Sequence, residues 1–324
     1  MLFLTVLFVA IGIPCLVESV NAQELKLRYD DQCLLETTCF VTATLDNEKF
    51  IDNINKHNKK LYIYYEIKNQ WQNIRRYVDS VSWAQLKGKD PKTSELNRCK
   101  PQKYITREAD SSFPDDGISL PCGLQPWSFF NDTFSIEVNS NVVEIDSSNI
   151  AWEKDLDNLY SDTLAVNFNN LPAYAGGGVI TTPIDQDEHF AVWMRLGTRS
   201  QFRKLYGTVQ TKTDTSAPIF QLGDTIRFVI ENNYNSYNFD GEKVVMISTL
   251  SFLGGQNNFT GILFLVLAGV FLLTAIFIMF VAALASTDVG DLNNLSWVKK
   301  EQKQYLLQQR LQEQGYRPNE ENDE

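Results

Sequence analysis

The sequence predicts a membrane protein with a large, mainly antiparallel β-sandwich domain held outside the cytosol. Three observations point to this fold class. Two runs without a charged side chain, at residues 1–17 and 261–285, enclose the central region of the 324-residue chain. Within that region, β-branched and aromatic residues form short strand-like runs, and helical patterns are few. The central region also has an even number of cysteines and N-glycosylation sequons, which are typical of an exported domain.

The charge balance excludes one class of function. The chain has 29 basic and 40 acidic residues, which gives a formal net charge of −11. A nucleic-acid-binding protein would instead carry a basic patch or stripe. With 44% hydrophobic residues, the chain has enough apolar surface to bury a core, so it is not disordered as a whole.

The second apolar run, Gly261–Ala285, is long enough to cross a bilayer as one helix, because a span needs about 20 apolar residues. We therefore expect a transmembrane helix at residues 261–285 and a tail at residues 286–324. Lys299, Lys300 and Lys303 follow this helix closely, which places the tail on the cytosolic side. Within the tail, Glu301–Gln314 is prone to form a helix.

The first apolar run allows two interpretations. As a secretory signal, it would be followed by a small-residue cleavage site at Val20-Asn21-Ala22. As a membrane helix, it would occupy residues 1–21 with a cytosolic leader that is short or missing. The residues alone favour the signal peptide, although no basic residue precedes Lys26. Both interpretations place residues 22–260 outside the cytosol.

Short runs in the central region predict its strands. These strands are Leu61–Ile67, an inner strand at His189–Arg195, a strand through Ile226, Phe228 and Ile230, and Val244–Ile247 after a tight turn at Asp240-Gly241. One short helix is expected at Gln70–Val81. Because the strand-like runs are short and are joined by long Asn-rich loops, we expect an antiparallel sandwich of two sheets.

The central cysteines allow three disulfide pairings. Their order in the sequence favours neighbours, so we predict Cys33–Cys39 and Cys99–Cys122. A zinc site is a poorer interpretation, because the chain has no Cys-x-x-Cys motif and only two histidines.

Three sequons occur at different places in this topology. Asn131-Asp132-Thr133 lies in the middle of the exported region and is the candidate glycosylation site. Asn258-Phe259-Thr260 is a second candidate site, but it adjoins the membrane helix, where a transferase has poor access. Asn294-Leu295-Ser296 follows the helix and is expected on the cytosolic side, unmodified.

Catalytic motifs are missing from the sequence. It has no Walker loop, His-Glu-x-x-His or Gly-x-Ser-x-Gly, and we expect neither a cofactor nor a metal site. Ala175–Gly178 is expected to be a turn, because no Lys-Ser/Thr pair follows it as in a phosphate-binding loop. His189 is expected to be a core histidine, and Arg75-Arg76 either binds an acidic surface or is simply solvated.

Small residues recur every seventh position along the second apolar run. These are Gly261, Ala268, Ala275 and Ala282. Seven residues bring a helix back to nearly the same face, with a drift of about 20°. Small side chains let a second helix approach closely, so we predict that this stripe packs against a partner helix, either the first membrane helix or a helix of another protein.

Several ordered blocks resemble one known family. They are Asn73–Val78, Pro121-Cys122-Gly123 with Phe130–Phe134, Glu188–Arg195 with Phe202–Gly207, Ser248–Gly255, and Gly290–Leu292 with Leu295–Trp297. Together these blocks resemble the ligand-effect-modulator family, whose members are non-catalytic β-subunits of phospholipid-flippase P-type ATPases. The resemblance covers nearly the whole chain.

The resemblance implies two membrane helices with both chain ends in the cytosol and a glycosylated lumenal β-domain with two disulfides. The first helix would then be uncleaved at residues 1–21, in agreement with family-like residues at Ile11–Pro14 and Arg28–Cys33. The implied partner is the catalytic α-subunit of a flippase. The implied role is to support assembly of that ATPase, its exit from the endoplasmic reticulum and its transport of aminophospholipid toward the cytosolic leaflet. The implied location is the endoplasmic reticulum, Golgi, endosome or plasma membrane.

Two features depart from the family pattern. The family usually has a cytosolic leader before its first helix, whereas this sequence begins inside the apolar run. The family also commonly has Asn-Pro after the Gly-Gly pair, where this chain has Asn257-Asn258. The phosphorylated Asp-Lys-Thr-Gly motif of the ATPases themselves is absent, and the nearest run is Asp90-Pro91-Lys92-Thr93.

Two other functions remain open from the residues. A stand-alone receptor or adhesin would have a cleaved signal and a single membrane span. An ectoenzyme such as a glycosidase would need two carboxylates about 5–10 Å apart, which a sequence does not show.

Overall fold

The computed structural model describes residues 1–33, 37–57, 60–106, 108–109, 117–165, 167–168, 176–212, 218–252, 254–284 and 295–313. The chain divides into two compact units. One contains the described parts of residues 1–16 and 259–324, and the other contains those of residues 17–258.

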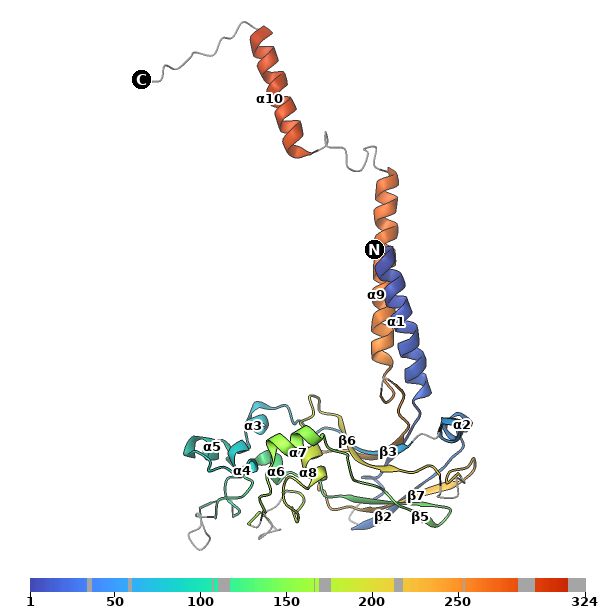
Figure 1. The fold of residues 1–324 in the computed structure, drawn as a ribbon, viewed down its shortest axis with the longest axis vertical. Coiled ribbons are helices and arrows are strands. Elements are labelled where there is room, and N and C mark those ends of the chain that lie inside the picture. The colour runs from blue at the N-terminus through green and yellow to red at the C-terminus, as the bar shows by residue number, and fades with distance from the viewer. Residues whose placement is uncertain are drawn as a thin grey trace. The chain divides into compact units, whose positions relative to one another are not determined.

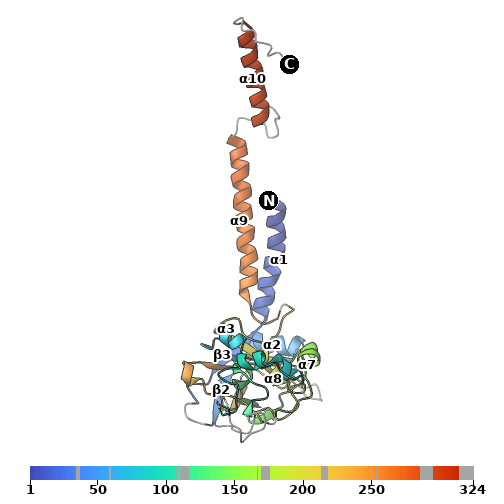
Figure 2. The same ribbon diagram turned by 90° about the vertical axis from the view of Figure 1, so that its left-hand side faces the viewer.

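The first unit is helical. Helix α1 (Leu2–Asn21) and helix α9 (Asn258–Leu284) are both long and apolar enough to cross a membrane. Where they belong to this unit they run antiparallel, side by side (Figures 1 and 2). The Phe8 ring stacks on Phe264 and Phe271, with centroids 5.8 and 5.5 Å apart. A third helix, α10 (Ser296–Glu313), includes most of the predicted helical tail segment.

The second unit contains the predicted β-sandwich. Each of its two sheets has four strands, and all strand pairs are antiparallel. The first sheet has the order β1 (Glu24–Arg28), β8 (Lys243–Ser248), β3 (Leu61–Ile67), β6 (Phe202–Val209). The second sheet has the order β2 (Thr38–Thr44), β7 (Thr225–Glu231), β4 (Thr133–Val138), β5 (Asn141–Val143).

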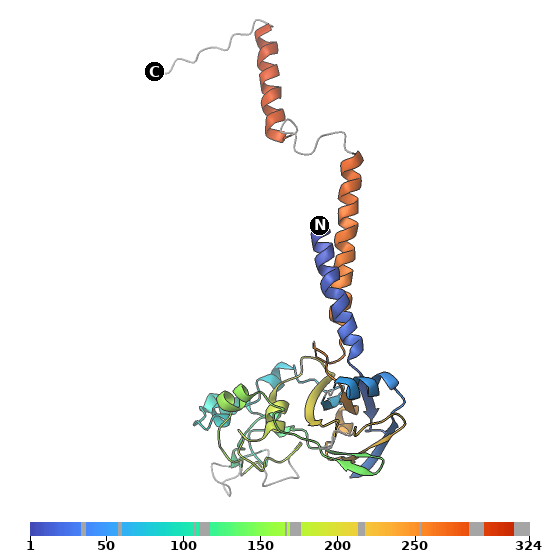
Figure 3. The ribbon, with the colours of Figure 1, turned by 45° about the vertical axis from the view of Figure 1, so that its right-hand side comes forward.

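Short helices accompany the sheets. They are α2 (Glu48–His57), α3 (Arg75–Val78), α4 (Trp83–Leu86), α5 (Thr93–Arg98), α6 (Leu124–Trp127), α7 (Glu153–Leu159), α8 (Glu188–Met194) and the 3₁₀ turn η3 (Tyr237–Phe239). Helices α3–α8 gather beyond one end of the sheets, and α2 lies toward the other end (Figures 1 and 3).

Alternation of apolar residues produces the core between the two sheets. Along β7, Ile226, Phe228 and Ile230 are buried, whereas Thr225 and Glu231 are exposed. A strand points successive side chains to opposite faces, so this pattern turns one face of β7 toward the other sheet. The predicted strands at residues 61–67 and around 226–230 are confirmed, as are the two packed antiparallel sheets.

The prediction of an inner strand at His189–Arg195 was wrong, because this segment forms helix α8. Asp187 caps the helix, with its side chain accepting a hydrogen bond of 2.9 Å from the backbone N–H of Phe190. Residues 190–194 are all buried. A helix surrounded by protein on every side needs no polar face, so its sequence lacks the helical period. The Asp before Glu188 was the helix-start signal that the strand prediction overlooked.

The predicted helix at Gln70–Val81 is limited to α3. The preceding residues bond to a distant loop instead of to one another: Gln70 N–H donates to the Ser200 carbonyl at 3.1 Å, and Asn73 Nδ2 donates to the Thr198 carbonyl at 2.9 Å. These tertiary bonds hold the chain out of helical geometry. Nearby in space, the predicted turn at Asp240 is present, but it joins strands of different sheets rather than a hairpin.

Two disulfides close loops of different length in the second unit. Cys33 is joined to Cys39 across a separation of 6 residues, and Cys99 to Cys122 across 23 residues. The remaining cysteine, Cys15, is free in α1.

Removing the disulfide of the longer loop should destabilise the domain more. On loop-closure entropy we expect Cys99→Ser with Cys122→Ser to lower the free energy of unfolding by about 3 kcal/mol, and Cys33→Ser with Cys39→Ser by about 2 kcal/mol. Denaturant unfolding of the full chain in detergent measures both values. A larger loss from the shorter loop would contradict this ranking.

Candidate functional site

A buried ion pair joins four strand ends at one end of the sandwich. Lys243 begins β8, and Asp132 directly precedes β4. The Lys243 ammonium lies 2.8 Å from Asp132 Oδ2, and both side chains are fully buried. Tyr29 follows β1 and contributes its hydroxyl, while residues 232–234 follow β7 and contribute backbone and side-chain groups. We call this group the strand-end cluster: Tyr29, Asp132, Asn232, Asn233, Tyr234 and Lys243.

The Asp132 carboxylate has a complete set of hydrogen-bond donors. Oδ2 accepts from Lys243 Nζ at 2.8 Å and from the Tyr29 hydroxyl at 2.7 Å. Oδ1 accepts from the backbone N–H groups of Asn233 and Tyr234, each at 2.6 Å. Four donors on one carboxylate offset the cost of removing it from water.

The Lys243 ammonium is satisfied in the same way. Besides the Asp132 carboxylate, it donates to the Tyr234 carbonyl at 2.7 Å and to Asn232 Oδ1. Burial lowers the pKa of Lys243, and the charge of Asp132 opposes that shift. Burial also raises the pKa of Tyr29 well above its ordinary value, and Asp132 adds to the effect, so Tyr29 remains a neutral donor.

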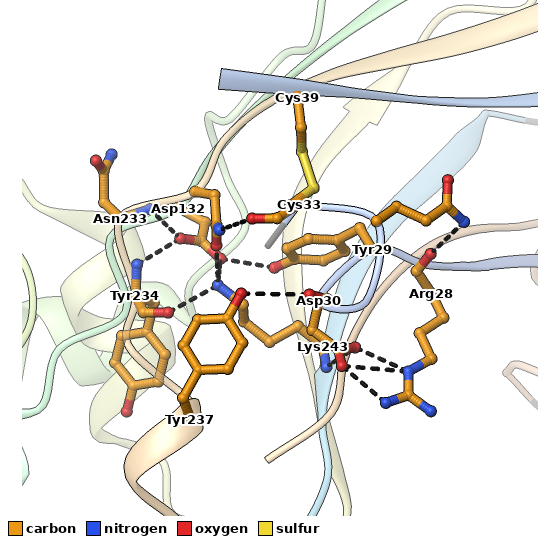
Figure 4. Close-up of a disulfide and its surroundings, with 12 residues drawn as sticks. Arg28, Tyr29, Asp30, Cys33, Cys39, Asp132, Asn233, Tyr234, Tyr237 and Lys243 are labelled. Carbon is orange, nitrogen blue, oxygen red and sulfur yellow. Dashed lines mark hydrogen bonds and ion pairs between the residues drawn. A yellow bond between two sulfur atoms is a disulfide. The ribbon is translucent and has the colours of Figure 1, made fainter. Parts of the chain in front are cut away.

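The cluster is linked to the first disulfide on one side and to Asp30 and Arg28 on the other (Figure 4). Asn232 Nδ2 donates to the Cys33 carbonyl at 2.9 Å, which ties the disulfide loop to the end of β7. On the other side, Asp30 accepts from the Lys243 backbone N–H at 2.9 Å and pairs with Arg28 at 2.8 Å. Burial alone would raise the pKa of Asp30, but the bonds from Arg28 and Lys243 outweigh it and hold this pKa below its ordinary value.

Aromatic rings connect this end of the sandwich to the helices. Phe130 stacks on Tyr65 of β3 with ring centroids 3.9 Å apart, and it also contacts Trp193 of α8 and Tyr234. Trp193 Nε1 donates to the Gln125 carbonyl at 2.9 Å, so its polar edge is satisfied while its rings are buried.

A second buried lysine holds the end of α8. Lys204 of β6 donates from Nζ to the carbonyls of Val192, at 3.0 Å, of Trp193, at 3.3 Å, and of Arg195. A cation there satisfies carbonyls that have no partner within the helix. Burial lowers the pKa of Lys204 to about 7, and the nearby charge of Arg195 acts in the same direction.

The small-residue stripe of α9 lies mainly against α1. Gly261, Ala268 and Ala275 are buried, whereas Ala282 is exposed. A Cβ added at Gly261 would lie 2.5 Å from Leu16 Cγ, so the glycine is what allows this close approach.

The sequons differ in their surroundings. Asn131 is half-buried, and its neighbour Asp132 is in the strand-end cluster. Thr133 begins β4 and is exposed, and its hydroxyl donates to Glu231 at 2.9 Å. Asn258 is the first residue of α9, where its Oδ1 accepts from the Ser19 hydroxyl at 2.6 Å. Asn294 lies outside the described residues.

The predicted arginine pair and His189 lie on different helices. Arg75 and Arg76 are exposed on α3, and Arg75 pairs with Asp79 at 3.5 Å. His189 is half-buried in α8, and its ring centroid lies 4.8 Å from that of Tyr206. Burial lowers the pKa of His189.

Of the predicted turn at Ala175–Gly178, Ala175 lies outside the described residues, and the Gly178 N–H donates to the Phe129 carbonyl at 2.6 Å.

In the described part of the chain, no cluster of three His, Cys, Asp or Glu residues is placed to hold a metal ion.

Sequence reasoning did not single out the strand-end cluster. Asp132 was noted only as the middle of a sequon, and Lys243 only precedes the predicted strand at 244–247. A lysine beside a run of apolar strand residues was the available signal, but its partner is more than a hundred positions away.

A family model described as the LEM3 (ligand-effect modulator 3) family, or CDC50 family, matches residues 15–288. This chain belongs to the CDC50/LEM3 family. The resemblance seen in the sequence is therefore confirmed. The matched CDC50 range contains the whole β-sandwich, both disulfides and α9.

Curated members of the CDC50 family match most of this chain. ALA-interacting subunit 3 of Arabidopsis thaliana is 30% identical over 305 residues, which are 91% of this chain and 82% of that protein. Cell cycle control protein 50A of Bos taurus is 29% identical, over 84% of this chain and 79% of its own length. The phospholipid-transporting ATPase accessory subunit CDC50 of Chaetomium thermophilum is 32% identical, over 72% of this chain and 59% of its own length.

Breaking the buried ion pair should be costly. Asp132→Asn leaves the Lys243 ammonium buried without its counter-charge, so we expect the free energy of unfolding to fall by about 3–5 kcal/mol. Denaturant unfolding of the full chain in detergent measures the change. Asp79→Asn is the matched control in an exposed pair and should change it by about 0.5 kcal/mol or less. Equal effects of the two substitutions would refute the assignment.

Lys204 should make stability depend on pH. The pKa of Lys204 is about 7 in the folded chain, whereas its ordinary value is 10.5. Between these two pH values Lys204 is protonated in the unfolded chain and mostly neutral in the folded chain. The free energy of unfolding therefore rises with pH across this window, by at most about 1.4 kcal/mol per pH unit. Lys204→Met should remove that rise, whereas the exposed control Lys154→Met should keep it. Unfolding curves measured above pH 7 with parallel pH dependence for both variants would contradict the prediction.

Proposed function

We propose that this chain is the accessory subunit of a phospholipid-flippase P-type ATPase. It would bind the catalytic subunit, support its assembly and exit from the endoplasmic reticulum, and permit transport of aminophospholipid toward the cytosolic leaflet. The observation that carries this proposal is the family match across residues 15–288, together with relatives named as ATPase accessory or ALA-interacting subunits.

The helices support a two-span topology. Helix α9 and the part of α1 before Glu18 have apolar residues on all faces, which is typical of lipid-facing segments. We propose that residues 1–21 and 261–285 span the membrane, that residues 22–260 are lumenal or extracellular, and that residues 286–324 are cytosolic. The membrane would be that of the endoplasmic reticulum, Golgi, endosome or cell surface.

The central domain is suited to binding a protein rather than to catalysis. Its buried charges in the strand-end cluster are fully satisfied by internal partners, so they stabilise the fold and have no free capacity for a substrate. We propose that the domain contributes binding energy, that its disulfides at Cys33–Cys39 and Cys99–Cys122 stabilise it, and that Asn131 is glycosylated. Lipid transport would be performed by the ATPase.

The helix pair is the part of this proposal most open to test. Gly261→Ala places a methyl group against Leu16, so we expect α1 and α9 to separate and recovery of the ATPase to fall several-fold. The measurement is purification of the full chain from its native membrane in mild detergent, followed by mass spectrometry of the bound proteins.

Gly269→Ala is the matched control on the same helix, because a Cβ there meets nothing within 4 Å among the described residues. It should leave recovery of the ATPase unchanged. If the wild-type chain brings down no P-type ATPase, and its mature form begins after residue 22, the receptor function replaces the proposed one.

A further inference from the structure

The segment around α3 exposes three apolar side chains among charged ones. Trp71, Ile74 and Val78 are 52%, 55% and 41% exposed. Gln72, which lies between them, is fully buried. Three exposed apolar side chains within eight residues, one of them a tryptophan, make this segment a candidate contact surface.

Internal bonds hold the exposed face in place. Gln72 Oε1 accepts from the Gly197 N–H at 2.7 Å, and the Tyr77 hydroxyl lies 2.8 Å from Ser128 Oγ. Gln125 Nε2 donates to the Val78 carbonyl at 2.7 Å. The apolar side chains therefore point outward from an anchored segment, not from a loosely held one.

A chain of contacts joins this segment to the two places where the domain continues into the apolar helices. The loop at residues 197–200 bonds to the α3 segment and leads directly into β6. In β6, Arg203 donates to Glu24 Oε1 at 2.7 Å, and the same oxygen accepts from the Gln256 N–H at 3.3 Å. Glu24 follows α1 by a few residues, and Gln256 precedes α9. Figures 1 and 3 show α3 on the side of the domain where the chain leaves it at both ends.

Phe252 lies on that same connection and is 92% exposed. Ser251 and Gly254 close a turn around it through two backbone hydrogen bonds, of 2.8 and 3.0 Å. Asn258, where α9 begins, is six positions after Phe252, and so short a stretch spans at most about 20 Å. If α9 crosses a membrane, the Phe252 ring lies near that membrane's surface.

We propose that Trp71, Ile74, Val78 and Phe252 contact the lumenal leaflet of the bilayer that holds this chain's own helices. The inference rests on the proposal that α1 and α9 span the membrane. Tryptophan and other apolar side chains are favoured at the boundary between headgroups and acyl chains. We name these four residues the leaflet-facing surface.

Basic residues beside this surface fit the same occupant. Arg75, whose side chain is 95% exposed, and Arg76 lie between Ile74 and Val78 on α3. A guanidinium binds phosphate through two parallel hydrogen bonds, and every glycerophospholipid has a phosphate. The two arginines would therefore bind headgroup phosphates while the apolar side chains reach the boundary below.

Spin labels on the full chain in phosphatidylcholine nanodiscs test this proposal. In a Cys15→Ala background, single cysteines at Ile74→Cys and Phe252→Cys would each carry a nitroxide. We expect the ratio of oxygen to water-soluble nickel accessibility to be several-fold higher at these labels than at Val142→Cys. Val142 is the matched control, because it is 76% exposed on β5 of the sheet that lacks β1 and β8. A label at Phe277→Cys in α9 reports whether the chain spans the bilayer.

Each outcome decides the proposal. Labels at 74 and 252 that behave like the label at 142, while the label at 277 lies in lipid, would overturn the leaflet contact and leave the accessory-subunit function intact. The same holds if the label at 74 becomes shielded only when a purified P-type ATPase is added, because the surface would then be a protein interface. A water-exposed label at 277 overturns the spanning topology and this inference together.

A lipid comparison identifies what the arginines bind. Arg75→Ala with Arg76→Ala should reduce the accessibility ratio at the label on residue 74 in phosphatidylcholine nanodiscs and in nanodiscs that also contain phosphatidylserine. A reduction in both would identify the phosphate shared by the two lipids, and a reduction only in the second would identify a net negative headgroup. An unchanged ratio in both would exclude the role of the arginines.

Discussion

The Lys243–Asp132 ion pair is the constraint on which the domain depends most. Two opposite charges are removed from water at the point where β1, β4, β7 and β8 end or begin. Their desolvation is offset only because the Asp132 carboxylate accepts four hydrogen bonds and the Lys243 ammonium donates three. These partners come from residues at the ends of β1, β4, β7 and β8, so the complete set requires the four strand ends to lie together.

A series of contacts leads from this end of the sandwich through α8 to the exposed segment around α3. Phe130 lies two residues before Asp132 in the sequence, and its ring stacks against Tyr65 of β3 and Trp193 of α8, which joins the helical part of the domain to the sheets. Lys204 then holds the end of α8, and the loop after α8 anchors the α3 segment. The exposed apolar side chains of that segment are therefore held by a continuous series of buried polar contacts.

Local sequence patterns were sufficient where the environment of a segment is simple. The strand at residues 61–67 and the alternating strand β7 were predicted correctly, because each has the composition or period of a strand in its own residues. The second apolar helix was equally clear from its length, whereas for the first apolar run the residues alone favoured a signal peptide and the family resemblance favoured a helix. The prediction failed at residues 189–195, where complete burial removes the period that distinguishes a helix from a strand, and at residues 70–81, where bonds to the 197–200 loop prevent a longer helix.

The sequence by itself determined the membrane-protein class, the two-sheet sandwich and the family, because these follow from local composition and from ordered blocks of residues. Only the tertiary structure decided that Asp132 and Lys243 form a buried pair, that α1 lies along the small-residue stripe of α9, and that Trp71, Ile74 and Val78 are exposed. The physical reason is that burial and pairing are properties of residues far apart in the chain. The residues beside a lysine or a tryptophan in the sequence do not show whether its side chain is buried or exposed.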